Sequence, residues 1–340
     1  MKAVAYYQPG PVDADGALVD IEVEAPTPTG HDLLVEVRAV SVNPIDTKVR
    51  RGVAPQAGPA DQAKILGWDA AGVVVETGLE VDGFQPGDAV WYAGEITRAG
   101  SNAEYQLVDA RIVGHKPQSL DFEQAAALPL TTITAWELLF ERLGVAPGKS
   151  PSAGSLLIVG AGGGVGSILI QLAARLTGLH IIATAARAGT ADWVRSLGAH
   201  TVLDHTRALS SELVDAGLTA PFYAASLTNT DDHLDEIVAC LVPQGRLALI
   251  DDPPSLDVSK LKPKSLSLHW ELMFTRSLFD TPDKSAQQRL LNEAAALVDA
   301  GVLRSTLQQH YGRIDAATIQ AAHALIESGR SRGKLVLTGF

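Results

Sequence analysis

The stretch SLLIVGAGGGVGSILIQLAARL, residues 155–176, decides how the second half of the chain folds. Its first five residues form a continuous apolar run, which is typical of a strand buried on both faces in a parallel sheet. Glycine-rich residues follow, and a helix is predicted over Val165–Leu176. The strict GxGxxG spacing is not met, but a glycine turn between strand and helix still brings backbone N–H groups close to a pyrophosphate. The stretch therefore predicts a dinucleotide-binding turn rather than a purely structural one.

Strands and helices alternate from about residue 150 to 250, beginning with this stretch. The predicted strands are His180–Thr184, His200–Leu203, Phe222–Ala225 and Gly245–Ile250, and the predicted helices are Asp192–Leu197 and Asp231–Leu241. Such alternation predicts an α/β fold with a doubly wound parallel sheet, the Rossmann arrangement. Ser226-Leu227 and Ile250-Asp251 end two of these strands, so we expect them at the ligand-binding edge of the sheet.

The end of the second strand distinguishes NAD from NADP. An enzyme that uses NAD usually carries an acidic residue there, which binds the ribose hydroxyls. This chain reads Thr184-Ala185-Ala186-Arg187 instead. A guanidinium at this place pairs well with a 2′-phosphate, so the sequence favours NADPH, although Arg187 could also be an ordinary surface residue.

The first third of the chain is rich in short strands. Leu33–Val42 alternates apolar and polar residues, Ala70–Thr77 reads as another strand, and Phe84–Val90 is a turn that enters a third. This pattern predicts a compact barrel-like domain up to about residue 120. The 340 residues are also too many for a single hydrophobic core, so two domains are expected.

Composition excludes several classes of protein. The net charge of −12 argues against a nucleic-acid partner, and no apolar run approaches the roughly 20 residues that span a bilayer. The N-terminal segment lacks the features of a signal peptide, which favours the cytoplasm. The single cysteine, Cys240, excludes a four-thiolate zinc site. His200 and His205, beside Asp204, are interpreted as surface residues rather than metal ligands.

Several motifs in a fixed order carry a resemblance to a known family. They are Ser41–Asp46 (SVNPID), Leu66–Val74 (LGWDAAGVV), Phe84–Val90 (FQPGDAV), Ala126–Glu137 (AALPLTTITAWE), the glycine turn, and Gly333–Leu337 (GKLVL). Together they resemble the medium-chain dehydrogenase/reductase superfamily over nearly the whole chain. Within it the chain looks like the quinone oxidoreductase branch, close to bacterial proteins called zinc-type alcohol dehydrogenase-like.

The resemblance implies a GroES-like β-barrel catalytic domain over residues 1–125, completed by about 305–340, and a Rossmann domain over 126–304. It implies that Asn43 and Asp46 lie beside the nicotinamide, that Thr134 approaches its carboxamide, and that Arg187 meets the 2′-phosphate. The pyrophosphate is expected on Gly163, Gly164, Val165 and Gly166. Trp68 and Tyr92 are candidates for an apolar substrate pocket, with core packing as the alternative, and Tyr92 also for the proton donor.

Zinc members of this superfamily bind their catalytic metal through a cysteine and a Gly-His-Glu segment. Here those positions read Asn43 and Gly67-Trp68-Asp69, so no metal is expected. Without a Lewis acid, a conjugated acceptor is easier to reduce than a plain ketone. The resemblance thus implies an NADPH-dependent quinone or enone oxidoreductase. A redox sensor that binds NADPH without turnover and a zinc alcohol dehydrogenase remain alternatives.

Residues Ser265–Phe274 (SLSLHWELMF) alternate like a strand. In the resembling superfamily an edge strand near this point often pairs across a two-fold axis. An exposed apolar edge favours pairing with a second copy, so the sequence predicts a homodimer. The expected partner in the reaction is a small-molecule substrate.

Overall fold

The computed structural model describes residues 1–52, 62–150 and 154–340. The chain divides into two compact units, which we call unit 1 (Met1–Ile133 with Phe274–Phe340) and unit 2 (Thr134–Met273). These bounds differ from the expected ones, because residues 126–133 and 274–304 belong to unit 1. Helix α9 (Ala286–Asp299) explains the second difference, since it packs on the β-rich part of unit 1: Asn292 accepts the His115 backbone N–H at 2.9 Å.

Unit 2 is built on a six-stranded sheet, and every pair of neighbouring strands in it is parallel. The strands are β9 (Ser155–Val159), β10 (His180–Thr184), β11 (Thr201–Leu203), β12 (Tyr223–Ser226), β13 (Arg246–Leu249) and β14 (Ser267–Trp270). Their order is β11-β10-β9-β12-β13-β14, so the strand order reverses between β9 and β12. This is the predicted doubly wound Rossmann sheet, in which ligands bind at the carboxyl ends beside the reversal.

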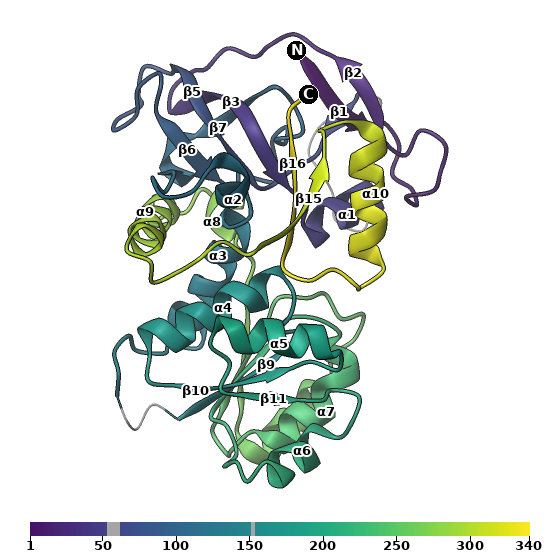
Figure 1. Cartoon of the computed structure of the whole chain (residues 1–340), viewed down its shortest axis with the longest axis vertical. Coiled ribbons are helices and arrows are strands. Elements are labelled where there is room, and N and C mark those ends of the chain that lie inside the picture. Colours follow the sequence, from purple (N-terminus) through teal and green to yellow (C-terminus); the bar gives the residue numbers. More distant parts are fainter. Residues whose placement is uncertain (53–61, 151–153) are drawn as a thin grey trace. The chain divides into compact units, whose positions relative to one another are not determined.

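Helices cover the sheet of unit 2. They are α4 (Gly164–Leu176), α5 (Ala188–Leu197), α6 (Leu209–Asp215) and α7 (Thr230–Cys240), with 3-10 helix η3 (Val258–Lys264). Figure 1 shows α4 beside α5 and α6 beside α7, each pair on its own side of the strands. Leu157, Ile182 and Leu247 are fully buried between the layers, as the continuous apolar runs predict. Before β9, the chain forms α3 (Pro129–Trp136), which continues as π-helix η2 (Glu137–Arg142).

Unit 1 contains two sheets. The larger follows the order β15-β16-β3-β5-β6-β8, with β7 paired to β3, and the smaller follows β2-β1-β4. The strands are β1 (Lys2–Tyr6), β2 (Val19–Glu22), β3 (Asp32–Ser41), β4 (Lys64–Ile65), β5 (Ala70–Thr77), β6 (Ala89–Tyr92), β7 (Tyr105–Asp109), β8 (Val113–His115), β15 (Leu307–Gly312) and β16 (Lys334–Thr338). The β-rich first domain is thereby confirmed.

The last strand, β16, returns to the first domain as expected. It pairs antiparallel with β3, with Val336 opposite Ser41, and lies between β3 and β15 (Figure 1). The remaining helices of unit 1 are α1 (Pro44–Arg50), α2 (Phe122–Ala126), α8 (Thr275–Leu278), α10 (Ala316–Glu327) and 3-10 helix η1 (Ala110–Ile112). None of the helices in the described ranges has both the length and the apolar character that crossing a bilayer requires.

Candidate dinucleotide site and buried acid cluster

The turn after β9 needs glycine at particular positions. Gly160 has φ +80°, and a Cβ there would lie 2.9 Å from the Thr228 side chain. A Cβ on Gly166 would lie 2.4 Å from the carbonyl oxygen of Ala161. Backbone cannot move aside as a side chain can, so only glycine lets α4 start this close to β9. These glycines bring the first turn of α4 to the carboxyl edge of the sheet.

The N-terminus of α4 is shaped to bind an anion. Its N-cap residue, Gly163, forms no side-chain cap, and the first N–H groups of a helix have no partner within it. A Cβ on Gly163 would meet only the Gly160 carbonyl oxygen, at 3.6 Å, so this side of the turn is not filled by side chains. Gly163, Gly164, Val165 and Gly166, to which the sequence assigns the pyrophosphate, therefore lie together at an open helix N-terminus, which we call the glycine cradle.

The neighbouring strand ends meet this cradle. Gly160 donates its N–H to Thr184 Oγ1 at 3.3 Å, and Leu227 donates its N–H to the Val159 carbonyl at 3.0 Å. Arg187 is the N-cap residue of α5, and its side chain is exposed. Within the part of the chain that the structure describes, its guanidinium forms no ion pair. Arg187 is thus available to a ligand at the end of β10.

Two other predicted cofactor residues are engaged in capping a helix. Both carboxylate oxygens of Asp251 accept hydrogen bonds from Thr230, at 2.8 Å from its N–H and at 2.5 Å from its hydroxyl. The Ser226 hydroxyl lies 2.7 Å from the same Thr230 hydroxyl, and the N–H of Ile250 points to the Ser226 carbonyl at 3.3 Å. Ser226 and Asp251 therefore stabilise the start of α7. Thr134, in α3, is buried.

Unit 1 contains a cluster of four buried polar side chains, Asn43, Asp46, Asp69 and Lys334, which we call the buried acid cluster. The Lys334 ammonium donates to Asp69 Oδ2 at 2.9 Å, to the Val42 carbonyl at 3.1 Å, and to Asn43 Oδ1. Asn43 Nδ2 donates to Asp69 Oδ2 at 2.9 Å. Asp69 Oδ1 accepts the Leu130 N–H at 2.8 Å, so both of its oxygens are engaged.

Asp46 differs from Asp69 because one of its oxygens is left over. Oδ2 accepts the Asn43 backbone N–H at 2.7 Å, whereas Oδ1 is buried and has no hydrogen bond of good geometry from the described residues. Burial raises the pKa of Asp46 to about 7, although the backbone N–H groups of Asn43 and Gly67 and the charge of Lys334 lower it, while Asp69 raises it further. Burial also raises the pKa of Asp69, against which Lys334 acts. Asp46 can therefore carry a proton near neutral pH.

The two aromatic candidates lie in the core of unit 1. Trp68 is fully buried, donates its indole N–H to the Glu95 carbonyl at 3.2 Å, and packs edge-on against Phe274 with ring centroids 6.3 Å apart. Tyr92 is buried too, and its hydroxyl has no hydrogen-bond partner in residues 1–52, 62–150 and 154–340. Burial raises the pKa of Tyr92. Both side chains are therefore buried within unit 1, and Tyr92 carries a hydroxyl that is left without a hydrogen-bond partner among the described residues.

The residues at the zinc-ligand positions do not fit zinc. Asn43 presents an amide, Trp68 an indole, and the Asp69 carboxylate is already bound by an ammonium and two N–H groups. Zinc in proteins prefers thiolate, imidazole or a free carboxylate. Across the described residues, no group of three or more His, Cys, Asp or Glu side chains is arranged to hold a metal ion.

Sequence reasoning named Asn43 and Asp46 but missed Asp69 and Lys334 as their partners. Lys334 opens an apolar strand whose first four residues are buried, and a lysine at such a place predicts a buried counter-charge. Asp69 belongs to Gly67-Trp68-Asp69, which stands where zinc members carry Gly-His-Glu, so the sequence does show an acid at this position. The signal that would have linked them is the pairing of β16 with β3, which no local pattern reveals.

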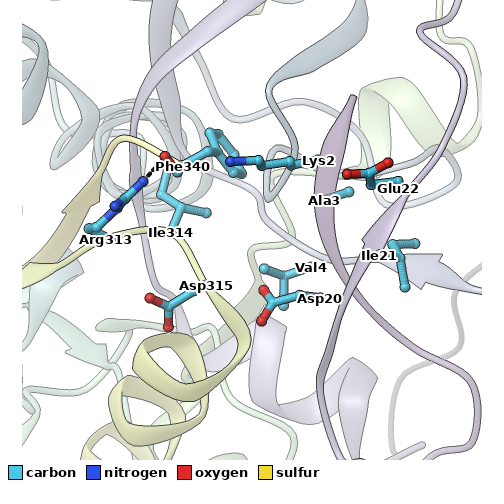
Figure 2. A pocket seen from close by; sticks show the side chains of 10 residues that line it. All are labelled: Lys2, Ala3, Val4, Asp20, Ile21, Glu22, Arg313, Ile314, Asp315 and Phe340. Carbon is cyan, nitrogen blue, oxygen red and sulfur yellow. Dashed lines mark hydrogen bonds between the residues drawn. The ribbon is translucent and has the colours of Figure 1, made fainter.

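A separate pocket of about 450 Å³ lies beside the smaller sheet of unit 1 (Figure 2). Its walls come from β1, β2 and the segments around Arg313 and Phe340, which are hydrogen-bonded to each other. Two of its acids support α10: Asp315 accepts the Thr318 N–H at 2.8 Å, and Asp20 accepts the Ala316 N–H at 2.9 Å. Both acids therefore stabilise the start of α10.

Similar proteins place this architecture in a family. Residues 29–118 match the family model described as alcohol dehydrogenase GroES-like domain, and residues 197–337 match the one described as zinc-binding dehydrogenase. The chain is 36% identical to a zinc-type alcohol dehydrogenase-like protein of Staphylococcus epidermidis, over 99% of both proteins. The chain belongs to the medium-chain dehydrogenase/reductase superfamily. Unit 1 is therefore the GroES-like domain of this superfamily, and unit 2 its Rossmann domain.

Solved structures of this superfamily share the fold over their whole length. A Rhizobium etli protein, solved as a candidate zinc-dependent alcohol dehydrogenase, is 53% identical, with a TM-score of 0.94 over 100% of this chain and 98% of that one. The quinone oxidoreductase from Coxiella burnetii is 26% identical, with a TM-score of 0.82 over 100% and 99%. Within the superfamily this chain lies in the quinone oxidoreductase-like branch. It is an oxidoreductase of a superfamily whose cofactor is a nicotinamide dinucleotide.

Proposed function

We propose that this chain transfers a hydride from NADPH to a quinone or an α,β-unsaturated carbonyl compound, without zinc. The observation that carries the proposal is the glycine cradle at the start of α4 together with the guanidinium of Arg187 after β10, which is exposed and forms no ion pair with a described residue. The cradle suits a pyrophosphate, and Arg187 suits a 2′-phosphate where an NAD enzyme would carry an acid. When bound, NADPH supplies the hydride.

The residues of unit 2 would bind the cofactor. We expect Gly163, Gly164, Val165 and Gly166 to bind the pyrophosphate, and Thr134 to meet the nicotinamide carboxamide. Leu227 and Ile250 directly follow β12 and β13 and would line the dinucleotide. Ser226 and Asp251 would act through their support of α7, because their polar groups are already engaged. Arg187 would decide between NADPH and NADH.

The residues of unit 1 would handle the acceptor and its proton. A hydride that adds to a quinone or enone leaves a negative charge on oxygen, and one proton completes the reduction to hydroquinone or ketone. The Asp46 carboxyl can hold that proton on its unpaired Oδ1, since its pKa of about 7 leaves part of it protonated at neutral pH. Asn43 and Lys334 would hold Asp46 and Asp69 in place. Trp68 and Tyr92 would shape the apolar surroundings.

Our expectation for the quaternary structure rests on β14, one of the two edge strands of the Rossmann sheet. The side chains of Trp270, in this strand, and Leu272, just after it, are about half exposed. An exposed edge with apolar side chains favours pairing with a second copy, so we expect a homodimer.

The test is a fluorescence titration of the purified chain with NADPH and with NADH, followed by turnover on a panel of quinones and enones. Arg187→Ala should weaken NADPH binding at least tenfold and leave NADH binding unchanged. Arg195→Ala is the matched control, because Arg195 is an exposed arginine on the same helix that pairs with Asp192. Binding of NADPH without turnover would favour a redox sensor. Metal analysis that finds one zinc ion per chain would favour a zinc alcohol dehydrogenase. If neither nucleotide binds, the proposal is refuted.

A further inference from the structure

Three basic side chains gather at the carboxyl edge of the Rossmann sheet, at its β11 end. We call Arg187, His205 and His233 the basic triad. Thr184 at the end of β10 is paired with Leu203 at the end of β11, and the Ala185 N–H points to the Leu203 carbonyl at 2.9 Å. The two chain segments therefore leave the sheet side by side, which brings His205 close enough to Arg187 for their charges to interact.

His233 completes the basic triad from the first turns of α7. Its ring stands edge-on to that of His205, with centroids 6.0 Å apart and an interplanar angle of 88°. His205 is exposed and His233 half-buried, so both reach solvent. Three groups that can be positive thus converge from α5, α7 and the segment after β11. Such a grouping is unfavourable unless an anion joins it.

None of the three basic side chains of the triad forms an ion pair with a described residue. Arg207, in the same segment, is paired with Glu212 and with Asp215 at 3.6 Å, whereas neither Arg187 nor His205 forms an ion pair with a described residue. Asp204, which is next to His205 in the chain, accepts both Thr206 donors on its Oδ1, at 2.9 and 2.8 Å. Two further exposed acids, Asp231 and Asp232, begin α7 near His233.

We infer that the basic triad forms the subsite for the 2′-phosphate of the cofactor, and that His205 makes the preference for NADPH over NADH stronger as the pH falls. This inference rests on the proposed function, because it takes NADPH as the cofactor. A phosphate monoester presents three acceptor oxygens and close to two negative charges at neutral pH. A guanidinium and two imidazoles offer donors from three directions, which is more than Arg187 alone supplies.

The sign of the pH effect follows from the histidines. In the free protein, burial, His233 and Arg187 lower the pKa of His205, and Asp204 raises it. A bound phosphate favours the protonated imidazole, so binding takes up a proton. As the pH rises through the pKa of the bound state, His205 loses its charge and the 2′-phosphate loses an ion pair. NADH has no 2′-phosphate, so its affinity should not change with His205.

The experiment uses the full chain and two fragments, adenosine 2′,5′-bisphosphate and 5′-AMP, titrated by calorimetry at pH 6.0 and pH 8.0. We expect the affinity ratio of bisphosphate to 5′-AMP to be at least fivefold higher at pH 6.0 than at pH 8.0. His205→Asn should remove most of that difference and leave 5′-AMP binding unchanged, and His233→Asn should reduce it. His310→Asn is the control, because His310 is an exposed histidine of unit 1.

The outcomes separate this inference from the proposed function. If His205→Asn keeps the full pH dependence of the ratio while NADPH still binds and is oxidised, the basic triad is not the subsite and the proposed function stands. If the unsubstituted chain binds bisphosphate no better than 5′-AMP, and NADPH no better than NADH, the choice of NADPH itself is wrong. Circular dichroism of each variant shows whether it has folded, and proton uptake on bisphosphate binding gives a readout that does not depend on the variants.

Discussion

Replacing Lys334 by methionine tests whether the buried acid cluster holds unit 1 together. Lys334 is 3% exposed, and its ammonium donates to Asp69, Asn43 and the Val42 carbonyl. Methionine has a similar length but no charge and no donor. The substitution therefore leaves the carboxylate of Asp69, which is fully buried, without a cation and removes three hydrogen bonds at once. Breaking a buried pair from one side costs about 3–5 kcal/mol.

The pH dependence of this loss has a definite sign. Without Lys334, the pKa of Asp69 in the folded state, already raised by burial, moves further above its unfolded value. A carboxyl with a raised folded pKa destabilises the fold above that pKa, and the penalty shrinks as the pH falls and the group takes up a proton. The stability deficit of Lys334→Met should thus be largest at pH 8 and clearly smaller at pH 5.

Urea unfolding with hydrogen exchange on peptides from β3 and β16 measures the deficit in unit 1 separately, because two compact units need not unfold together. The matched variant is Lys334→Met with Asp69→Asn, which removes both charges. It should recover at least half of the lost stability, since an uncharged pair of similar volume is often as stable as the ion pair. A deficit below about 1 kcal/mol, or a double variant as unstable as the single one, would refute this account of the cluster.

Three further predictions concern the glycine turn, Asp46 and Asp251. Gly166→Ala should lower the melting temperature and abolish nucleotide binding, because its Cβ would lie 2.4 Å from a backbone oxygen. Gly163→Ala should fold normally and weaken only NADPH binding. Differential scanning fluorimetry with and without NADPH separates the two variants. Because the folded pKa of Asp46 is raised to about 7, stability should fall by up to about 4 kcal/mol between pH 4 and pH 8, and Asp46→Asn should flatten this slope in urea unfolding at several pH values. Asp251→Ala should lose about 1–2 kcal/mol through the uncapped start of α7, with a loss of NADPH affinity below threefold; a loss above tenfold in a titration would mean that Asp251 touches the cofactor.

The Rossmann unit was largely readable from the sequence. The run Ser155–Val159 is short, continuous and apolar, and the glycine turn after it has only a few folded interpretations, so strand, turn and helix were predicted together. The following strands appear at or near their predicted places because each is bounded by turn residues. The π-helical end at Glu137–Arg142 was not predicted, since a single extra residue per turn leaves the apolar pattern of a helix almost unchanged.

The site was less readable, because its contacts join residues far apart in the chain. Local patterns placed Asn43 and Asp46 at the start of α1, but nothing local shows that Lys334 reaches them through the pairing of β16 with β3. The role of Asp251 depends in the same way on which helix begins beside the end of β13. Local residue chemistry predicts the kind of group at a site, and only the topology decides which groups meet.

The position of β16 also affects how the chain can fold during its synthesis. Asp69 and Lys334 are separated by 265 residues. At about 5–20 residues per second, a ribosome needs on the order of 13–50 s to add the lysine after the aspartate. Unit 2 lies wholly within this interval and has all its strands before Lys334 emerges. The GroES-like unit instead lacks the partner of Ala39–Ser41 in β3 and the counter-charge of Asp69 until β16 has been synthesised, so its larger sheet is completed last.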